Sequence, residues 1–264
     1  MAVFIVFETL IGGEEKIIKI ELLEELNFTD MTPGKKFRDA IKNSSPLIIP
    51  GAINAYSAKL AEKANHKAIY LSGSGVAAAS YGLPDLGVTS LEDVLIDAKR
   101  ITDATDLPLL VDIDTGWGGS EEISNTIVEM ENAGVAAVHI EDQVYDKRCG
   151  HRPNKQIVSV AEMQDRLKAA VDAKKDESFF IMARTDALAS EGIEKAIERC
   201  GEYLKVGADG IFFEAALSLD EYKEFKKNFS FPLLANITEF GKTPLFTQKA
   251  VSYTHLRAHE TPMY

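Results

Sequence analysis

The sequence is poor in cysteine and in positive charge, and it contains no long hydrophobic run. Its 264 residues include two cysteines, Cys149 and Cys200. These are too few for a disulfide framework in a chain of this length, so we expect a reducing compartment, the cytoplasm or, in a eukaryote, the mitochondrial matrix. No apolar run approaches a membrane span, and the apolar residues 1–7 lack the basic segment and cleavage site of a signal peptide. We therefore expect neither a membrane protein nor a secreted one.

Positive charge is the second shortage. The chain has 29 Lys and Arg residues against 41 Asp and Glu, a formal net charge of -12. This balance argues against nucleic acid as a partner. A small anionic ligand would need local positive charge, from a metal ion or a few arginines. The hydrophobic content of 45% fits a globular protein with one large core or two small ones.

From residue 46 onward, apolar runs alternate with helical patterns. The runs lie at residues 46–53, 68–71, 108–113, 136–140, 179–183, 210–213 and 232–237. Ser90, Ser159 and Ser218, each followed three residues later by an acid, are predicted helix N-caps. Nearly continuous apolar runs are typical of strands buried on both faces of a parallel sheet with crossover helices. An open doubly wound sheet and a closed (β/α)8 barrel both fit this rhythm.

The ends of the runs distinguish these two α/β architectures. Polar side chains follow almost every run at its C-terminal end. An open sheet would concentrate its ligand groups at one switch point, whereas a barrel collects them around one mouth. We therefore predict a (β/α)8 TIM-type barrel.

We expect this barrel to be truncated after the seventh strand. No eighth apolar run follows residue 246, and residues 251–256 form only a poor strand candidate. His255 and His259 are interpreted as solvated residues rather than metal ligands. The predicted organisation is an extension at 1–30, with a candidate strand at 3–7 and a short helix at 20–26, the incomplete barrel at 31–247, and a tail at 248–264.

Asp112 and Asp114 are the strongest metal-site candidates. Lying two residues apart on one strand, they direct both carboxylates to one face, which is unfavourable unless a cation lies near them. With Glu141 on the next strand they form an oxygen-rich site suited to Mg²⁺ or Mn²⁺. Asp85 could join as an outer-shell acid, although alone it is typical of a turn. The alternative for the whole set is surface carboxylates at strand ends.

Cys149 lies within Lys147–His151, a thiol surrounded in sequence by cationic groups. Nearby positive charge lowers a thiol pKa, so we expect Cys149 to exchange a proton near neutral pH, as a general acid must. The alternative is an inert surface thiol. Cys200 falls within a helical pattern and is expected to be packed.

Four further features are candidate ligand groups. The run Ser72-Gly73-Ser74-Gly75 follows a strand and could offer backbone N–H groups to a carboxylate or phosphate, or be an ordinary turn. Arg184 could bind a carboxylate in bidentate fashion, or be held in a structural salt bridge by Asp186. Asn236 and Thr238 share one strand face and could bind a ligand. Tyr70 could be a core aromatic or an acid/base phenol.

Together these residues resemble the isocitrate lyase and phosphoenolpyruvate mutase superfamily, in its methylisocitrate lyase branch. The resemblance spans residues 31–247. Its motifs are YLSGSG (70–75), LPDLG (83–87), VDIDTGWG (111–118), HIEDQ (139–143), KRCGHRPNK (147–155), ARTDA (183–187) and LANITEFGKTPLF (234–246).

The resemblance implies a barrel enzyme that uses Mg²⁺ to cleave 2-methylisocitrate, a small tricarboxylate, to pyruvate and succinate. It also implies a homo-oligomer, a tetramer, and a role in propionate catabolism. Cys149 would protonate the departing succinate carbanion, and Tyr70 is our candidate base. The implied metal site is Asp112 and Asp114, with Glu141 and Asp85 in support. The implied substrate-binding residues are Ser72, Gly73, Ser74, Gly150, Arg184, Glu214, Asn236 and Thr238.

Two departures from the superfamily bear on this interpretation. Ser74 stands where members usually have glycine, which adds a hydroxyl beside the expected carboxylate site. The resemblance also stops near residue 247, before the eighth strand and the helices that members exchange between subunits, so we expect an incomplete or misassembled gene product. Two alternatives stay open: isocitrate cleavage or another 2-oxo-acid lyase or decarboxylase reaction, and an inactive barrel that serves only as a binding or assembly partner.

Overall fold

A computed structural model of the chain describes residues 31–238 and 241–259, with side chains as far as residue 252. The chain divides into two units, Met1–Thr32 and Pro33–Tyr264, and the description below concerns the second. The strand and helix expected within residues 1–30, and the last five residues of the expected tail, lie outside the described residues. No helix in the described ranges is long and apolar enough to cross a membrane.

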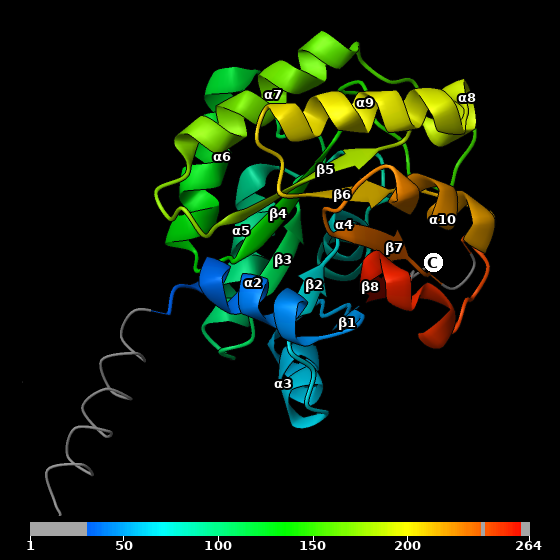
Figure 1. Ribbon diagram of the computed structural model, residues 1–264. Coiled ribbons are helices and arrows are strands. Elements are labelled where there is room, and N and C mark those ends of the chain that lie inside the picture. The colour runs from blue at the N-terminus through cyan, green and yellow to red at the C-terminus, as the bar shows by residue number, and fades with distance from the viewer. Residues whose placement is uncertain (1–30, 239–240, 260–264) are drawn as a thin grey trace, which may run out of the picture. The chain divides into compact units, whose positions relative to one another are not determined.

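Eight parallel strands form the centre of the fold (Figure 1). They are β1 (Leu47–Pro50), β2 (Ile69–Leu71), β3 (Leu109–Asp112), β4 (Ala137–Glu141), β5 (Phe180–Thr185), β6 (Gly210–Phe213), β7 (Leu233–Asn236) and β8 (His255–His259). Their order in the sheet is β1-β8-β7-β6-β5-β4-β3-β2, and every neighbouring pair is parallel. A parallel bridge between Gly51 and Tyr70 connects β1 with β2. The predicted barrel architecture is therefore confirmed.

The eighth strand corrects the expectation that the sheet would end at β7. The backbone of β8 pairs with β1 on one side and with β7 on the other. Without it, both strands would present unpaired N–H and C=O groups along an open edge. The apolar pattern did not predict β8, because strand pairing uses the main chain and places no demand on side-chain polarity. No helix follows β8 among the described residues.

Helices surround the strands (Figure 1). They are α2 (Pro33–Asn43), α3 (Ala55–Lys63), α4 (Gly73–Tyr81), α5 (Leu91–Thr102), α6 (Ser120–Asn132), α7 (Val160–Ala173), α8 (Leu188–Glu191), α9 (Ile193–Lys205), α10 (Leu219–Lys227) and the 3-10 helix η1 (Lys249–Thr254). The predicted N-caps are confirmed: Ser90, Ser159 and Ser218 each accept a hydrogen bond from the backbone N–H three residues on. At Ser159 the Glu162 side chain accepts a hydrogen bond from Arg166 at 2.8 Å.

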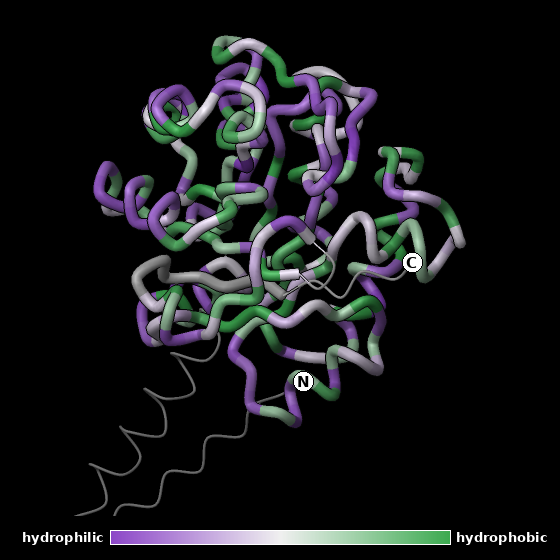
Figure 2. Tube along the Cα trace, turned by 90° about the vertical axis from the view of Figure 1, so that its right-hand side faces the viewer, coloured by the Kyte–Doolittle hydropathy of each residue, from purple (hydrophilic) through white to green (hydrophobic). Residues whose placement is uncertain are grey.

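Successive strand residues face two different cores, because side chains alternate across a strand. On β3, Leu109 and Val111 pack outward under the helices, while Leu110 packs into the barrel interior. The helices alternate between hydrophilic and hydrophobic residues along their turns, as helices with one buried face do (Figure 2). The strand residues that point inward fill the barrel interior with apolar groups. The same alternation decides which residues at the strand ends point into the mouth.

Helix α2 packs against the N-terminal ends of the strands. Phe37 is fully buried in the interior core, with its ring edge-on to Phe180 at 5.4 Å between centroids. Arg38 donates to the carbonyl of Ser178 at 2.7 Å and pairs with Asp209 at 2.8 Å. This end of the barrel is therefore filled, which leaves the C-terminal ends of the strands as the open mouth.

Candidate active site and metal centre

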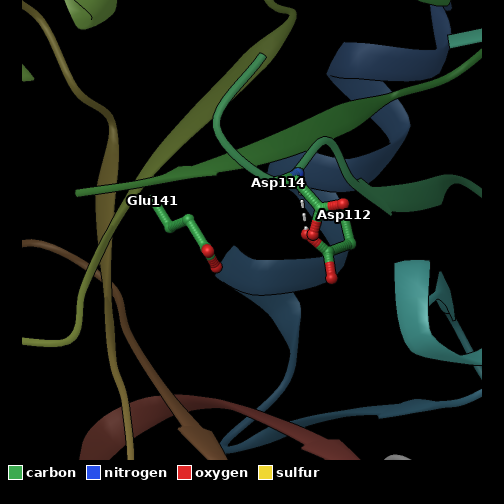
Figure 3. Close-up of side chains that lie close together, drawn as sticks. All are labelled: Asp112, Asp114 and Glu141. Carbon is green, nitrogen blue, oxygen red and sulfur yellow. Dashed lines mark hydrogen bonds between the residues drawn. The ribbon is translucent and has the colours of Figure 1, made fainter. Parts of the chain in front are cut away.

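Three carboxylates converge where β3 and β4 end (Figure 3). Asp112, Asp114 and Glu141 are buried, and one oxygen of each lies within 4.8 Å of the others. The backbone N–H of Asp114 donates to Asp112 Oδ1 at 3.0 Å. Asp114 has a positive φ of 48°, a conformation that aspartate tolerates better than most residues, and it turns the chain out of β3. We call these three residues the acidic triad.

Burial makes ionisation of the acidic triad unfavourable at Asp114 and Glu141. Burial raises the pKa of Asp114 to about 6, an effect that Lys147 opposes and Asp112 reinforces. Burial also raises the pKa of Glu141 well above its usual value, although Arg184 opposes it. Glu141 Oε1 is buried and has no hydrogen-bond partner. Clustered buried carboxylates with an unused oxygen are the donor set that a hard divalent cation prefers, so the residues fit Mg²⁺ or Mn²⁺.

Asp85 lies outside the triad and is connected to it through Lys147. The Lys147 ammonium is 2.6 Å from Asp85 Oδ1 and 2.6 Å from Asp114 Oδ1. Burial would raise the pKa of Asp85, but the charge and hydrogen bond of Lys147, together with Arg184 and Cys149, outweigh burial and lower that pKa. Asp85 therefore lies outside the acidic triad, and the supporting role expected for it stays a prediction.

Arg184 and Asp186 form the next layer of the mouth. The guanidinium of Arg184 is 3.1 Å from Glu141, 3.0 Å from Asp186 and 3.9 Å from Glu214. The salt bridge with Asp186 that the sequence left as an alternative is therefore present. Although burial opposes it, the charges of Arg184 and Lys155 lower the pKa of Asp186 to about 2.

Cys149 does not have the lowered pKa expected from its sequence neighbours. Burial raises the pKa of this thiol to about 12, and the charge of Asp85 adds to the effect. The expectation failed because the thiol is buried, and because the Lys147 ammonium pairs with Asp85 and Asp114. The thiol is therefore protonated at neutral pH, which is the state that a proton donor needs and a nucleophile does not.

A cavity of about 1290 Å³ opens above these groups. Its wall includes Ser74, Asp85, Lys147 and Cys149. The acidic triad is not itself part of the wall and lies beneath Lys147, which contacts Asp114. The cavity therefore brings the thiol and the outer acid to one surface, with the triad directly behind it.

The Ser72–Gly75 run is the start of a helix rather than a turn. Ser72 is the N-cap of α4, and its hydroxyl is buried without a hydrogen-bond partner. The backbone N–H of Gly73, expected to receive an anionic ligand, donates to Asp112 Oδ2 at 3.2 Å. A Cβ on Gly73 would lie 3.3 Å from that same oxygen, so glycine allows the close approach of α4 to the triad.

The remaining predicted ligand groups line the inward face of the later strands. Glu214, Asn236 and Thr238 are all buried. Glu214 Oε2 and Asn236 Oδ1 have no hydrogen-bond partner. A Cβ on Gly150 would lie 2.2 Å from Glu214 Oε1 and 2.5 Å from Arg184, so this glycine contacts the other predicted substrate groups directly. Buried polar atoms without partners at one mouth indicate a polar ligand.

Tyr70 lies deeper than the other candidates. Its side chain is fully buried among the interior core residues, and its hydroxyl is 2.9 Å from His139 Nε2. Burial lowers the pKa of His139 to about 3, and Arg184 adds to the effect, so the ring is neutral. Its Nδ1 lies 3.7 Å from Asp112. Of the two readings of Tyr70, the packing corresponds to the core aromatic.

Sequence reasoning assigned no role to Lys155 or His139, which contact the site. A lysine in a loop and a histidine in an apolar run are usually structural, and only spatial proximity to Asp186 and Asp112 distinguishes these. Cys200 is fully buried in the outer core, as expected. The side chains of His255 and His259 lie outside the described part of the structure.

Known proteins resemble this chain along most of its length. The sequence profile of the family described as phosphoenolpyruvate phosphomutase matches residues 37–253. A protein of Shewanella oneidensis named 2-methylisocitrate lyase is 62% identical over 219 residues, which are 83% of this chain and 75% of the relative. The Escherichia coli protein of that name is 56% identical over 226 residues, 85% of this chain and 76% of the relative.

Solved structures lead to the same family. The structure of oxaloacetate acetylhydrolase in complex with 3,3-difluorooxalacetate matches with a TM-score of 0.83 and 34% identity, covering 87% of this chain and 80% of that one. From its barrel fold, its sequence motifs and these matches we conclude that this chain belongs to the phosphoenolpyruvate mutase and isocitrate lyase superfamily.

Proposed function

We propose that this chain is a carbon–carbon lyase that cleaves 2-methylisocitrate to pyruvate and succinate. Relatives that are 62% and 56% identical carry the name 2-methylisocitrate lyase. The observation that carries the proposal is the placement of Cys149: its protonated thiol shares a cavity wall with Lys147, which contacts the acidic triad. Lyase cleavage needs both a proton donor and a site for an α-hydroxycarboxylate, and this mouth combines them.

Asp112, Asp114 and Glu141 would hold Mg²⁺ or Mn²⁺, with Asp85 in an outer position. When bound, the cation supplies positive charge that stabilises the oxygen anion developing on the α-hydroxycarboxylate. Arg184, Asn236 and Thr238 face the same mouth and would bind the substrate carboxylates, together with Ser72, Gly73, Ser74 and Gly150. Glu214, which lies 3.3 Å from His151 Nε2 and 3.9 Å from Arg184, would join them as a substrate-binding residue.

The proton bookkeeping assigns one role to Cys149. Loss of the hydroxyl proton lets the C–O electrons form the carbonyl of pyruvate, and the electron pair of the breaking C–C bond passes to the succinate carbon. The Cys149 S–H donates its proton to that carbon, and the resulting thiolate recovers a proton from solvent. Because burial raises the thiol pKa to about 12, the proton stays on sulfur until the carbanion forms.

The base that accepts the hydroxyl proton of the substrate does not line the cavity. Tyr70 stays our candidate from the sequence, but its hydroxyl contacts His139 rather than the cavity. As a base it would have to act through that ring, which lies between it and Asp112. A Tyr70→Phe variant with full turnover would remove Tyr70 from the mechanism.

The test measures pyruvate release from 2-methylisocitrate in the presence of Mg²⁺. We expect turnover in the parent chain and a loss of at least about 100-fold in Cys149→Ser, because general acid catalysis contributes this much. Cys200→Ala is the matched control, since this second thiol is buried in the outer core and should leave turnover unchanged. Most of the turnover surviving in Cys149→Ser would contradict the assigned proton donor.

A second candidate is the cleavage of isocitrate, or a lyase or decarboxylase reaction on a 2-oxo acid. The similarity to an oxaloacetate acetylhydrolase structure with a TM-score of 0.83 favours it. Oxaloacetate and isocitrate therefore belong in the same assay as alternative substrates. Turnover of oxaloacetate that is independent of Cys149 would select this reaction, and no turnover of any substrate would select the inactive barrel.

A further inference from the structure

The segment from Lys147 to Lys155, which we call the thiol loop, is held at both ends by buried lysines. At its start, Lys147 contacts Asp85 and Asp114. At its end, the Lys155 ammonium lies 2.7 Å from Asp186 Oδ1 and donates to the carbonyl of Gly150 at 2.7 Å. Cys149 lies between these two anchors, so its position depends on both.

Lys155 is buried to an extent that a solvated loop lysine would not be. Its side chain is 3% exposed and that of Asp186 is fully buried. Burying an ammonium and a carboxylate together carries a desolvation penalty that their attraction often fails to repay. A buried pair of this kind is therefore poor evidence of stabilisation, and its role has to be sought in what it orients.

Asp186 is shared between the thiol loop and the site arginine. One carboxylate oxygen accepts from Lys155 at 2.7 Å, and the other accepts from Arg184 Nε at 3.0 Å. The backbone N–H of Asp186, the residue after β5, donates to Asp142 Oδ1 at 2.9 Å, and this bond holds the end of β5 in place. The same carboxylate thus sets the orientation of Arg184 and the location of Lys155.

The thiol loop also lies directly against Arg184. The steric room at Gly150 is so small that a Cβ would approach an Arg184 nitrogen to 2.5 Å. Lys155 binds the carbonyl of this same glycine, the residue after Cys149. Moving Lys155 away from Asp186 would therefore move Gly150 away from Arg184 and would displace Cys149, the residue before it.

We propose that Lys155 is a positioning residue that, through Asp186, locks the thiol loop onto the arginine that binds substrate. The inference rests on the proposed function for its effect on turnover, but its structural part concerns only the placement of Cys149. The step from loop to chemistry is one of orientation, because small displacements of a reacting group cost large factors in rate.

The experiment compares Lys155→Met, which keeps the length of the side chain and removes its charge, with Lys155→Arg, which keeps the charge. Lys168→Met on the exposed face of α7 is the matched control. The first readout is the rate at which iodoacetamide alkylates Cys149 in the folded protein, where Cys200 is buried. We expect alkylation to be at least about 10-fold faster in Lys155→Met, close to the parent rate in Lys155→Arg, and unchanged in Lys168→Met.

The second readout separates kcat from KM for pyruvate formation. We expect kcat of Lys155→Met to fall by about 100-fold, with KM changed much less because Arg184 keeps Asp186 and Glu141 as partners. Alkylation and kcat that both match the parent in a folded Lys155→Met protein would overturn the proposal. If Lys155→Met does not fold, Lys155→Gln is read in the same way. Faster alkylation in a chain without lyase turnover would overturn the proposed function and leave the positioning role intact.

Discussion

At the scale of a single residue, the protonation of Cys149 shows how far spatial and sequential neighbours differ. Lys147 and Arg148 precede the thiol in the chain, yet the Lys147 ammonium forms ion pairs with two carboxylates. What acts on the thiol is burial and the negative charge of Asp85, and both raise its pKa. Cys149 is therefore a protonated thiol, able to donate a proton, rather than a thiolate.

This protonation state predicts the pH dependence of thiol reactivity. The pKa of Cys149 is raised from 9.0 to about 12, so the thiolate fraction is reduced at every pH below that value. The rate of alkylation of the native protein should therefore still be rising at pH 10, where an ordinary thiol has levelled off. Quenching the alkylation reaction at a series of times and pH values, and measuring the alkylated fraction by mass spectrometry, gives this rate. A plateau near pH 9 would contradict the assignment.

Gly150 yields a second prediction at this scale. In Gly150→Ala the new methyl group would displace Glu214 and Arg184, which its Cβ would approach to 2.2 and 2.5 Å. We expect loss of at least about 10-fold in kcat/KM with little change in melting temperature, because the displaced groups are site residues at the mouth. Gly201→Ala is the matched control: it lies within α9 with 3.8 Å of clearance and should keep activity. Equal activity of the two variants would show that the close packing at Gly150 is unimportant.

At the scale of the element, helix α2 decides whether the barrel interior is closed. Phe37 fills the interior core at the N-terminal ends of the strands, and Arg38 fastens α2 to the start of β5 and to Asp209. Helix α4 has the opposite task at the mouth, where Gly73 brings it against the triad. One end is thus built for stability and the other for chemistry.

The stability of the closed end can be measured. Phe37→Ala should lower the free energy of unfolding by about 3–5 kcal/mol, since it removes a fully buried ring and leaves a cavity. Lys42→Ala, exposed on the same helix, should change it by less than about 0.5 kcal/mol. Urea denaturation followed by circular dichroism gives both values. A Phe37→Ala cost comparable to that of Lys42→Ala would mean that α2 does not close the barrel.

At the scale of the whole molecule, the acidic triad links stability to pH and to metal. The folded-state pKa of Asp114 is raised from 3.8 to about 6, so the folded protein binds more protons than the unfolded chain between these values. Stability without metal should therefore fall as the pH rises through this window. A bound divalent cation would replace those protons and restore the stability.

This linkage predicts how Mg²⁺ changes the melting temperature. We expect Mg²⁺ to raise it clearly at pH 7.5 and much less at pH 5, where protons compete for the triad. In Asp112→Asn/Asp114→Asn the increase should disappear at both pH values. Differential scanning fluorimetry at matched ionic strength, with KCl as the control salt, measures the effect. An equal increase from KCl would rule out specific binding at the triad.

The sequence by itself determined the features that depend on nearby residues. The alternation of apolar runs with helical segments predicted seven strands. Ser90, Ser159 and Ser218 predicted three helix starts, because an N-cap bonds only to the backbone three residues on. The sequence also predicted that Asp112, Asp114 and Glu141 would form one acidic site at the ends of neighbouring strands, and the three carboxylates lie together.

Only the tertiary structure decided what depends on contacts between distant residues. The eighth strand follows from the backbone needs of β1 and β7, not from its own side chains. The raised pKa of Cys149 follows from burial and Asp85, and the role proposed for Lys155 rests on its contact with Asp186, 31 positions away. Charge and desolvation act through space over a few ångströms, and the fold, rather than the order of residues, sets which groups lie that close.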